Sequence, residues 1–283
     1  MKGLGTELAK RYSCALLTSF KSWFSHNDIE IKRVNVKGAN KTATLKNEKT
    51  PEPHVLNSVW RFCDERQAAA IAFTGFRPQV LGSYKGTDGL LLGDLPELEI
   101  DNGQKKVVFK TISMRALVRE DRSKTGRAYE GLICEEGCKR IEEYLIKRMN
   151  SGEELTEQSA AIADDFDHGG TITTKSICKI VRKAFRHAGF QWRPYILRRF
   201  HDSRMGLAVA KSEIGLLEEW VKFWMGRSGD IEAEYRLHKK LSDSQLEQMR
   251  SAYLRREQKS LNFSLGPELL TWLFRRELLR SWD

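Results

Sequence analysis

The sequence lacks any long hydrophobic run, and its few cysteines follow no pattern. No apolar stretch approaches the roughly 18 residues that a membrane-spanning helix needs. The start of the chain, Met1-Lys-Gly-Leu-Gly, has no signal-peptide hydrophobic region. The five cysteines are an odd number without the spacing of a disulfide framework. These absences argue against a membrane protein or a disulfide-stabilised secreted domain, and they predict an intracellular protein without membrane contact.

A metal-ligand pattern is also missing. Cys134 and Cys138 are spaced like one half of a metal site, but no second pair of Cys or His residues has ligand spacing. His168 stands beside two glycines and is expected to lie in a loop. We therefore expect no bound metal. The sequence has no internal repeat and no low-complexity tract either.

What the sequence has is a large and uneven positive charge. Its 283 residues carry 48 Lys and Arg against 38 Asp and Glu, a net charge of +10. The basic surplus is six charges in residues 1–50, six in 104–127 and eight in 175–204, whereas 130–170 carries an acidic excess of seven. Three basic stretches around one acidic stretch fit a protein with a phosphate-facing side. Charge alone does not distinguish DNA, RNA and a membrane surface as the partner.

The hydrophobic pattern predicts a mainly helical protein. Hydrophobic residues make up 40% of the chain, which is enough for a packed core. Periodic apolar positions predict helices over residues 5–25, 54–74, 135–149, 173–188, 205–225 and 244–260, the last opened by a capping box of Ser244 and Glu247. The β-branched segment Val107–Val118, the turn at Ser123–Gly126 and the segment 128–133 predict a β-hairpin. The expected fold class is mainly α with a small antiparallel β-sheet (α+β).

Four motifs with possible chemistry stand in a fixed order along the chain. They are Thr74-Gly75-Phe76-Arg77-Pro78, then Lys124 at the turn of the expected hairpin, then Pro194-Tyr195-Ile196-Leu197-Arg198, and last Met225-Gly226-Arg227 followed eight residues later by Tyr235. The third lies in the strongest basic run, which also carries Phe190, Trp192 and Phe200. Each motif is weak alone, and the ordered set is specific.

This ordered set resembles the tyrosine recombinases, the phage-type integrases, over about Thr50 to Tyr253. It looks closest to integrases of archaeal viruses and plasmids, because three phrases are similar to that subgroup: Arg77-Pro-Gln-Val-Leu-Gly82, Met225-Gly-Arg-Ser-Gly-Asp-Ile-Glu232 and Met249-Arg-Ser-Ala-Tyr253. The resemblance implies the catalytic-domain fold of that family.

The resemblance implies a role for each motif residue in DNA strand cleavage. Arg77 and Arg198 would bind the non-bridging oxygens of the scissile phosphate, since guanidinium groups are planar, cationic and bidentate. Tyr235 would be the nucleophile that forms a covalent 3′-phosphotyrosyl link. Lys124 would be the general acid for the departing 5′ oxygen. The link conserves bond energy and the cations take the place of a metal, so neither ATP nor a cofactor is expected.

Two positions depart from the common family pattern. Tyr195 stands where His is frequent, and Arg227 stands where His or Trp is usual. Both can donate a hydrogen bond to the phosphate, but neither is a good base at neutral pH. The general base for Tyr235 therefore stays open between water and activation by the surrounding positive charge. His201-Asp-Ser-Arg204 also spells the His-x-x-Arg pattern; we prefer Tyr195 and Arg198, and His201 would lie one helical turn beyond Arg198.

The resemblance also implies partners and a domain organisation. Double-stranded DNA would contact Lys32, Arg33, Arg122, Arg127, Lys175, Arg182, Lys183 and Arg193. The protein would act at DNA in the cytoplasm of the host cell, as a homo-oligomer that is tetrameric on DNA and a monomer or dimer when free. Residues 1–47 would be the last helix and linker of an N-terminal DNA-binding domain that is short or begins late, 48–260 the catalytic domain, and 261–283 an amphipathic tail helix that packs on its own domain or on a neighbouring protomer.

The expected function is site-specific integration or excision of a mobile element. Two other functions stay open: a non-catalytic DNA-binding protein on a recombinase scaffold, and a type IB topoisomerase-like enzyme that relaxes DNA. Each motif residue also has a structural interpretation. Arg77 could pair with an acidic neighbour, Lys124 could be a solvated turn lysine, Arg198 could only position a phosphate, and Tyr235 could be a buried aromatic on the helical face of Ile231.

Overall fold

The computed structural model describes residues 2–29, 49–164, 170–210, 216–227 and 242–260. The chain divides into two units, Met1–Lys49 and Thr50–Asp283, which are described separately. Among the described residues of the first unit, helix α1 (Lys2–His26) confirms the helix expected over 5–25. Its aromatic side chains are exposed, with Tyr12 at 68% and Phe20 at 56%. The predicted tail, 261–283, lies outside the described residues.

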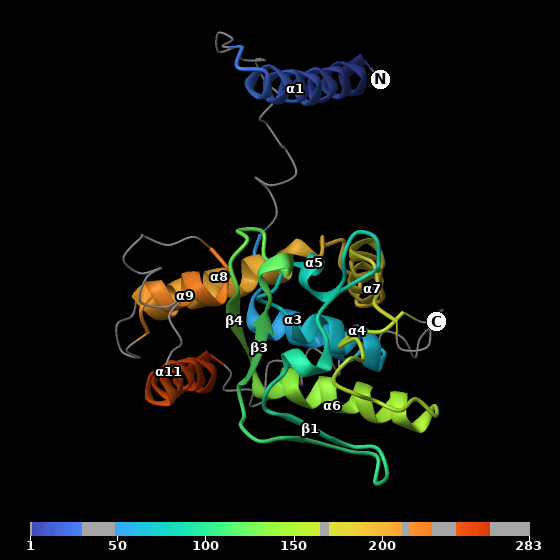
Figure 1. The fold of residues 1–283 in the computed structure, drawn as a ribbon, viewed down its shortest axis with the longest axis vertical. Helices are drawn as coiled ribbons and strands as arrows, with labels where there is room; N and C mark the ends of the chain where they lie inside the picture. The colour runs from blue at the N-terminus through green and yellow to red at the C-terminus, as the bar shows by residue number, and fades with distance from the viewer. Residues whose placement is uncertain (1, 30–48, 165–169, 211–215, 228–241, 261–283) are drawn as a thin grey trace, which may run out of the picture. The chain divides into compact units, whose positions relative to one another are not determined.

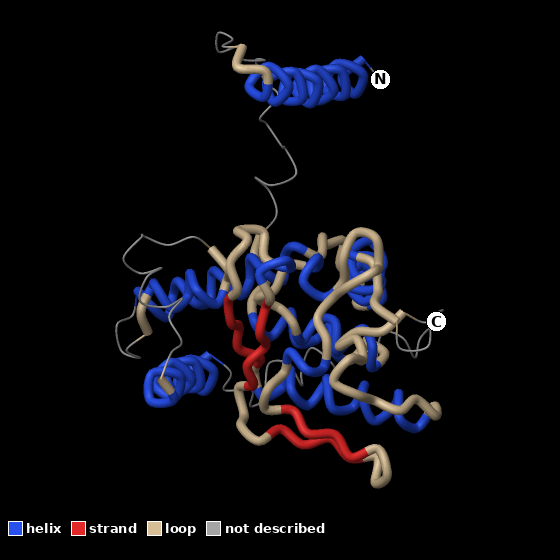
Figure 2. Tube along the Cα trace, viewed as in Figure 1, coloured by secondary structure: helices blue, strands red, loops and turns tan. Residues whose placement is uncertain are grey.

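The second unit is mainly helical, as Figures 1 and 2 show. Its described helices are α3 (Pro53–Trp60), α4 (Glu65–Ala72), α5 (Pro78–Leu81), α6 (Glu135–Asn150), α7 (Thr174–His187), α8 (Tyr195–Ala210), α9 (Glu218–Trp224) and α11 (Asp243–Ser260). Helices α6 and α7 confirm the periodic segments 135–149 and 173–188. No helix among the described residues is long and apolar enough to cross a bilayer.

The single helix expected over 54–74 is two helices. Asp64 has an extended backbone, with ψ of 167°, and it caps α4. Its carboxylate accepts a hydrogen bond from the Gln67 backbone N–H at 2.8 Å, and the Gln67 side chain accepts one from the Asp64 N–H at 3.3 Å. This capping box begins a new helix where periodicity alone continues the old one.

The later helices also differ from expectation. The helix expected over 205–225 is the end of α8 and the whole of α9. Helix α11 begins earlier than the predicted capping box, because Ser242 and Gln245 form the reciprocal contacts: the Gln245 N–H donates to the Ser242 hydroxyl at 3.3 Å, and the Ser242 N–H donates to the Gln245 side chain at 3.0 Å.

The strands form two separate antiparallel ribbons rather than one sheet, as Figure 2 shows. Strand β1 (Leu98–Asp101) pairs with β2 (Lys106–Phe109), and β3 (Met114–Val118) pairs with β4 (Tyr129–Ile133). The expected strand 107–118 is therefore divided between two ribbons. Ser113, buried and with φ of +62°, interrupts the extended backbone just before β3. The predicted hairpin is confirmed for β3 and β4.

The core lies around helix α4. Its alanine-rich face is buried and packs against α6 and α7, because small side chains permit close approach of neighbouring helices. Strand β4 packs against α9, and α9 packs against α8. The fold class, mainly α with small antiparallel sheets, is confirmed. These contacts bring the start of α5, the first turn of α8 and the end of α9 to one place.

Candidate active site

Arg198 lies in the first turn of α8 and is almost fully buried, with 2% of its surface exposed. Its Nη1 donates to the Gly75 carbonyl at 2.8 Å, and its Nη2 donates to the Met225 carbonyl. Gly75 precedes α5 and Met225 caps the end of α9. One guanidinium group therefore joins three segments that are far apart in the sequence.

Arg77 reaches the same turn. It is the N-cap residue of α5 and is half-buried, and its Nη1 donates to the Gly226 carbonyl at 3.4 Å. The carbonyls of Met225 and Gly226 are consecutive, so one turn holds both arginines. The two arginines that the sequence motifs single out thus meet at the last motif, Met225-Gly226-Arg227.

The acceptors for these arginines are neutral. The hydrogen bonds from Arg198 to Gly75 and Met225 use two of the five N–H donors of a guanidinium group. Burial lowers the pKa of Arg198, Arg77 lowers it further, and Tyr129 and Tyr195 act in the opposite direction. Arginine still stays protonated in proteins. A cluster of this kind favours binding of an anion, because each bound anion relieves the repulsion between Arg77 and Arg198.

Tyr129 lies next to Arg77, Arg198 and the Gly226 turn, although no sequence motif includes it. It is the first residue of β4 and is 3% exposed. Within the described part of the chain, its hydroxyl and the buried Nε of Arg198 make no hydrogen bond of normal geometry. Burial raises the pKa of Tyr129, while Arg198 and Arg77 act to lower it. Burial alternates along β4 and turns Tyr129 inward, and the sequence Tyr129-Glu-Gly-Leu-Ile133 has no matching alternation that would predict this.

The turn at Gly226 depends on the absence of a side chain. Gly226 has φ of +54°, a conformation that favours glycine. A Cβ placed there would lie 2.4 Å from the Tyr129 ring. The turn is closed by the Gly226 N–H, which donates to the Phe223 carbonyl at 2.8 Å, and by the Arg227 N–H, which donates to the Lys222 carbonyl at 3.0 Å.

Arg227 is paired with a carboxylate that none of the sequence motifs includes. Its Nη2 donates to Asp202 Oδ2 at 2.8 Å, and both side chains are partly exposed. Asp202 lies on α8, one helical turn after Arg198. An anion at this site would compete with Asp202 for Arg227.

The remaining predicted residues lie around this cluster or outside the described residues. Tyr195 begins α8 and is 54% exposed. Lys124 lies on an exposed turn between β3 and β4, where Gly126 has φ of +67°. His201 is buried with its ring against Gly75, 3.2 Å from where a Cβ would lie. Tyr235 is outside the described residues.

The predicted DNA-contact residues are in different environments. Arg122 is engaged by Asp88 at 3.2 Å and by Asp121 at 3.1 Å. Arg127 is exposed and Arg193 is half-buried. The three predicted contacts on helix α7 are all exposed: Lys175, Arg182 and Lys183. Lys32 and Arg33 are outside the described residues.

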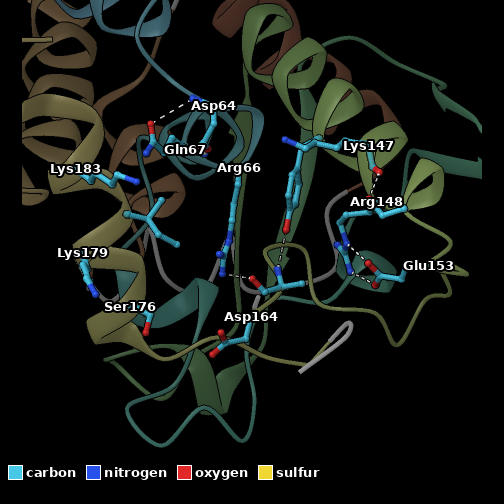
Figure 3. Close-up of a pocket in the computed structure, with 14 residues that line it drawn as sticks. Asp64, Arg66, Gln67, Lys147, Arg148, Glu153, Asp164, Ser176, Lys179 and Lys183 are labelled. Atoms are coloured by element: carbon cyan, nitrogen blue, oxygen red, sulfur yellow. Dashed lines mark hydrogen bonds and ion pairs between the residues drawn. The ribbon is translucent and has the colours of Figure 1, made fainter. Parts of the chain in front are cut away.

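A second polar region is a pocket of about 540 Å³ between α4, α6 and α7, shown in Figure 3. Arg148 makes two hydrogen bonds to the Glu153 carboxylate, at 2.8 and 2.5 Å, and a third to the Ala160 carbonyl at 2.7 Å. Lys147 pairs with Glu65 at 2.6 Å. On the opposite wall, Lys179 and Lys183 extend from α7 (Figure 3). Carboxylates thus compensate the cations of α6 in this pocket, unlike Arg77 and Arg198.

No group of three or more His, Cys, Asp or Glu side chains among the described residues could hold a metal ion. Burial raises the pKa of the Cys63 thiol to about 12, so this thiol is protonated at neutral pH. It donates to the Val59 carbonyl at 3.2 Å and has a structural role.

Comparisons with known proteins add little. No protein-family model matches the sequence, and no curated protein matches it significantly. Among solved structures, the crystal structure of XerA recombinase is similar at 17% sequence identity, with 83% of this chain and 73% of that chain covered and a TM-score of 0.43. A likeness this remote assigns no role to any residue of this chain.

Proposed function

We propose that this protein is a tyrosine site-specific recombinase that cleaves and rejoins double-stranded DNA through a covalent 3′-phosphotyrosyl intermediate. The observation that carries the proposal is the meeting of Arg77 and Arg198 on the carbonyls of Met225 and Gly226. The ordered sequence motifs select the same two arginines independently of these contacts. Their joint position beside Arg227 is the arrangement that phosphoryl transfer without a metal needs.

The proposed chemistry balances without a cofactor. The Tyr235 hydroxyl oxygen attacks the scissile phosphorus, and the bond from phosphorus to the 5′ oxygen breaks. The departing 5′ oxygen takes a proton from Lys124, and the phenolic proton passes to water. Arg77 and Arg198 neutralise the charge that builds on the non-bridging oxygens. Rejoining is the reverse reaction with a 5′ hydroxyl of the partner strand as nucleophile.

The biological role in the proposal comes from the sequence resemblance. The subgroup phrases favour integration or excision of a mobile element of the archaeal virus or plasmid type. A reaction on two DNA sites requires several protomers, so the proposed active form is a tetramer on DNA. Three of the exposed cations of α7 are proposed contacts for the DNA backbone: Lys175, Arg182 and Lys183.

The test is to trap the covalent intermediate. Nicked duplexes that carry candidate sites are incubated with the protein, adducts are separated on denaturing gels, and the modified residue is mapped by mass spectrometry. We expect an adduct on Tyr235 that disappears in Tyr235→Phe. The matched control is Tyr253→Phe, which removes a buried hydroxyl 3.4 Å from the Leu132 carbonyl and should leave the adduct in place.

One observation favours a second candidate, DNA binding without cleavage. Arg227 is engaged by Asp202 at 2.8 Å and so is not available to a phosphate in this arrangement. Tight DNA binding without an adduct on any duplex would support this candidate and contradict the recombinase. Relaxation of supercoiled plasmid by an adduct-forming protein that joins no second site would instead indicate a topoisomerase-like activity.

A further inference from the structure

We infer that Tyr129 is a positioning residue for the two arginines: its ring supports the Met225–Arg227 turn, and its hydroxyl is the neutral acceptor that Arg198 uses when it turns toward a phosphate. The inference rests on the proposed function for its role in cleavage. It adds a residue that lies on β4, outside all four sequence motifs.

The ring argument comes from packing at Gly226. The space that a Gly226 Cβ would occupy is filled by three carbon atoms of the Tyr129 ring, 2.4, 2.6 and 2.8 Å away. The Met225–Arg227 turn therefore packs directly against the Tyr129 ring. Because the carbonyls of Met225 and Gly226 hold Arg198 and Arg77, a displacement of the turn moves both guanidinium groups together. Such coupling makes the ring a common support for the cluster.

The hydroxyl argument comes from two unmatched polar atoms. The Tyr129 hydroxyl and the Arg198 Nε–H are both buried and, within the described ranges, neither makes a hydrogen bond of normal geometry. The Arg198 side chain is nevertheless close enough to the Tyr129 hydroxyl to act on its pKa through a side-chain hydrogen-bond contact. A phenol oxygen can accept a hydrogen bond and Nε–H can only donate one, so the two groups are complementary. Burial raises the pKa of Tyr129 and keeps it neutral at neutral pH. A neutral acceptor can orient the Arg198 side chain without neutralising its positive charge, so that charge remains available to bind a phosphate.

Three variants separate the ring from the hydroxyl. Tyr129→Phe keeps the ring and removes the acceptor, and Tyr129→Leu removes the support for the turn. The matched control is Tyr144→Phe, since Tyr144 is similarly buried but its hydroxyl accepts from the Ala163 N–H at 3.2 Å, in the pocket between α4, α6 and α7. Single-turnover cleavage of the nicked duplex, DNA affinity and the melting temperature are measured for each.

For Tyr129→Phe we expect unchanged DNA affinity, an unchanged or raised melting temperature and cleavage slower by about tenfold, because an unmatched buried hydroxyl stabilises nothing until the reaction uses it. For Tyr129→Leu we expect cleavage slower by about a hundredfold, as for a misplaced catalytic group. Tyr144→Phe should melt earlier and cleave at the wild-type rate. Wild-type cleavage by Tyr129→Phe overturns the hydroxyl role, and wild-type cleavage by Tyr129→Leu overturns the inference as a whole.

A second readout keeps this inference separate from the proposed function. Inorganic phosphate, added at constant ionic strength, should raise the melting temperature of the wild type, and Arg198→Gln should abolish the rise. Tyr129→Leu should reduce it strongly, and Tyr144→Phe should not. If the wild type forms no DNA adduct but phosphate behaves as described, the recombinase proposal fails and the positioning role stands. A full phosphate response in Tyr129→Leu overturns the positioning role whether or not the wild type cleaves DNA.

Discussion

Two buried arginines, Arg198 and Arg148, differ in the groups that accept hydrogen bonds from their guanidinium groups. Both are almost fully buried, at 2% and 6% exposure, and each donates to at least one backbone carbonyl. Arg148 also makes two hydrogen bonds to the Glu153 carboxylate, whereas the hydrogen bonds described for Arg198 go to carbonyls. A buried charge without a counterion is costly. The Glu153 carboxylate therefore compensates the charge of Arg148, whereas the acceptors described for Arg198 leave its positive charge uncompensated.

The arginines around Glu97 resemble Arg148, because a carboxylate accepts their hydrogen bonds. Glu97 is 7% exposed and is bonded by Arg115 at 2.5 Å and by Arg250 at 2.9 Å, which ties α11 to β3. Both arginines are held by the Glu97 carboxylate, and neither belongs to the four ordered motifs. Burial alone therefore does not distinguish Arg198 from Arg148 and Arg250, and the type of acceptor does.

The largest expected effect comes from exchanging each buried arginine for lysine. Arg198→Lys keeps the charge but loses the fork that spans Gly75 and Met225, and we expect DNA cleavage to fall by about 10²- to 10³-fold. Arg148→Lys should leave cleavage unchanged and lower the free energy of unfolding. Single-turnover kinetics and urea unfolding of both variants check this. Equal loss of cleavage in the two variants would remove the distinction.

A slightly smaller effect is expected at the turn that holds the arginines. Gly226→Ala introduces a Cβ 2.4 Å from the Tyr129 ring at φ of +54°, and cleavage should fall by about a hundredfold as the carbonyls shift. Gly189→Ala is the control, because Gly189 has φ of +84° but open space around its Cβ position. It should cost about 1 kcal/mol of stability and no activity. Normal cleavage by Gly226→Ala would show that the turn tolerates displacement.

The next prediction concerns the contribution of Glu153 to stability as the counterion of buried Arg148. Glu153→Gln leaves Arg148 buried without a full counterion, and we expect a loss of roughly 2 kcal/mol, reduced from the fully buried case because Glu153 is partly exposed. Glu65→Gln, which breaks the exposed pair with Lys147, should change stability by less than about 0.5 kcal/mol. Urea unfolding at neutral pH measures both. A larger loss from Glu65→Gln than from Glu153→Gln would contradict the structural role of Arg148.

The smallest effect concerns pH. Burial raises the pKa of Glu130 above its ordinary value, Arg115 acts to lower it, and Glu97 raises it. The folded state therefore binds the proton more tightly than the unfolded state, so this group lowers stability as the pH rises from the ordinary carboxyl pKa through the raised one. Glu130→Gln should melt slightly later at neutral pH, and the gain should shrink on acidification. A constant gain at every pH would contradict the raised pKa.

Helix content was predictable because it rests on local periodicity. Helices α1, α6 and α7 match their predicted segments, and the hairpin of β3 and β4 follows its turn signal at Ser123–Gly126. The errors occur where a cap or a single backbone angle interrupts a pattern: Asp64 divides one apolar segment into α3 and α4, and Ser113 divides another between β2 and β3. A capping contact is specific to a few atoms and leaves the surrounding hydrophobic pattern unchanged.

The charge of +10 predicted a polyanionic partner. Residue order and residue type predicted the candidate catalytic residues Arg77, Lys124, Tyr195, Arg198, Arg227 and Tyr235. Packing decided which of the described residues meet, and it added Tyr129 and Asp202 to the site. The acceptors of Arg198 and Arg77 are backbone carbonyls, which every residue possesses, so no sequence pattern can mark them. Only the three-dimensional approach of α5, α8 and α9 distinguishes the carbonyls of Gly75, Met225 and Gly226 from all others.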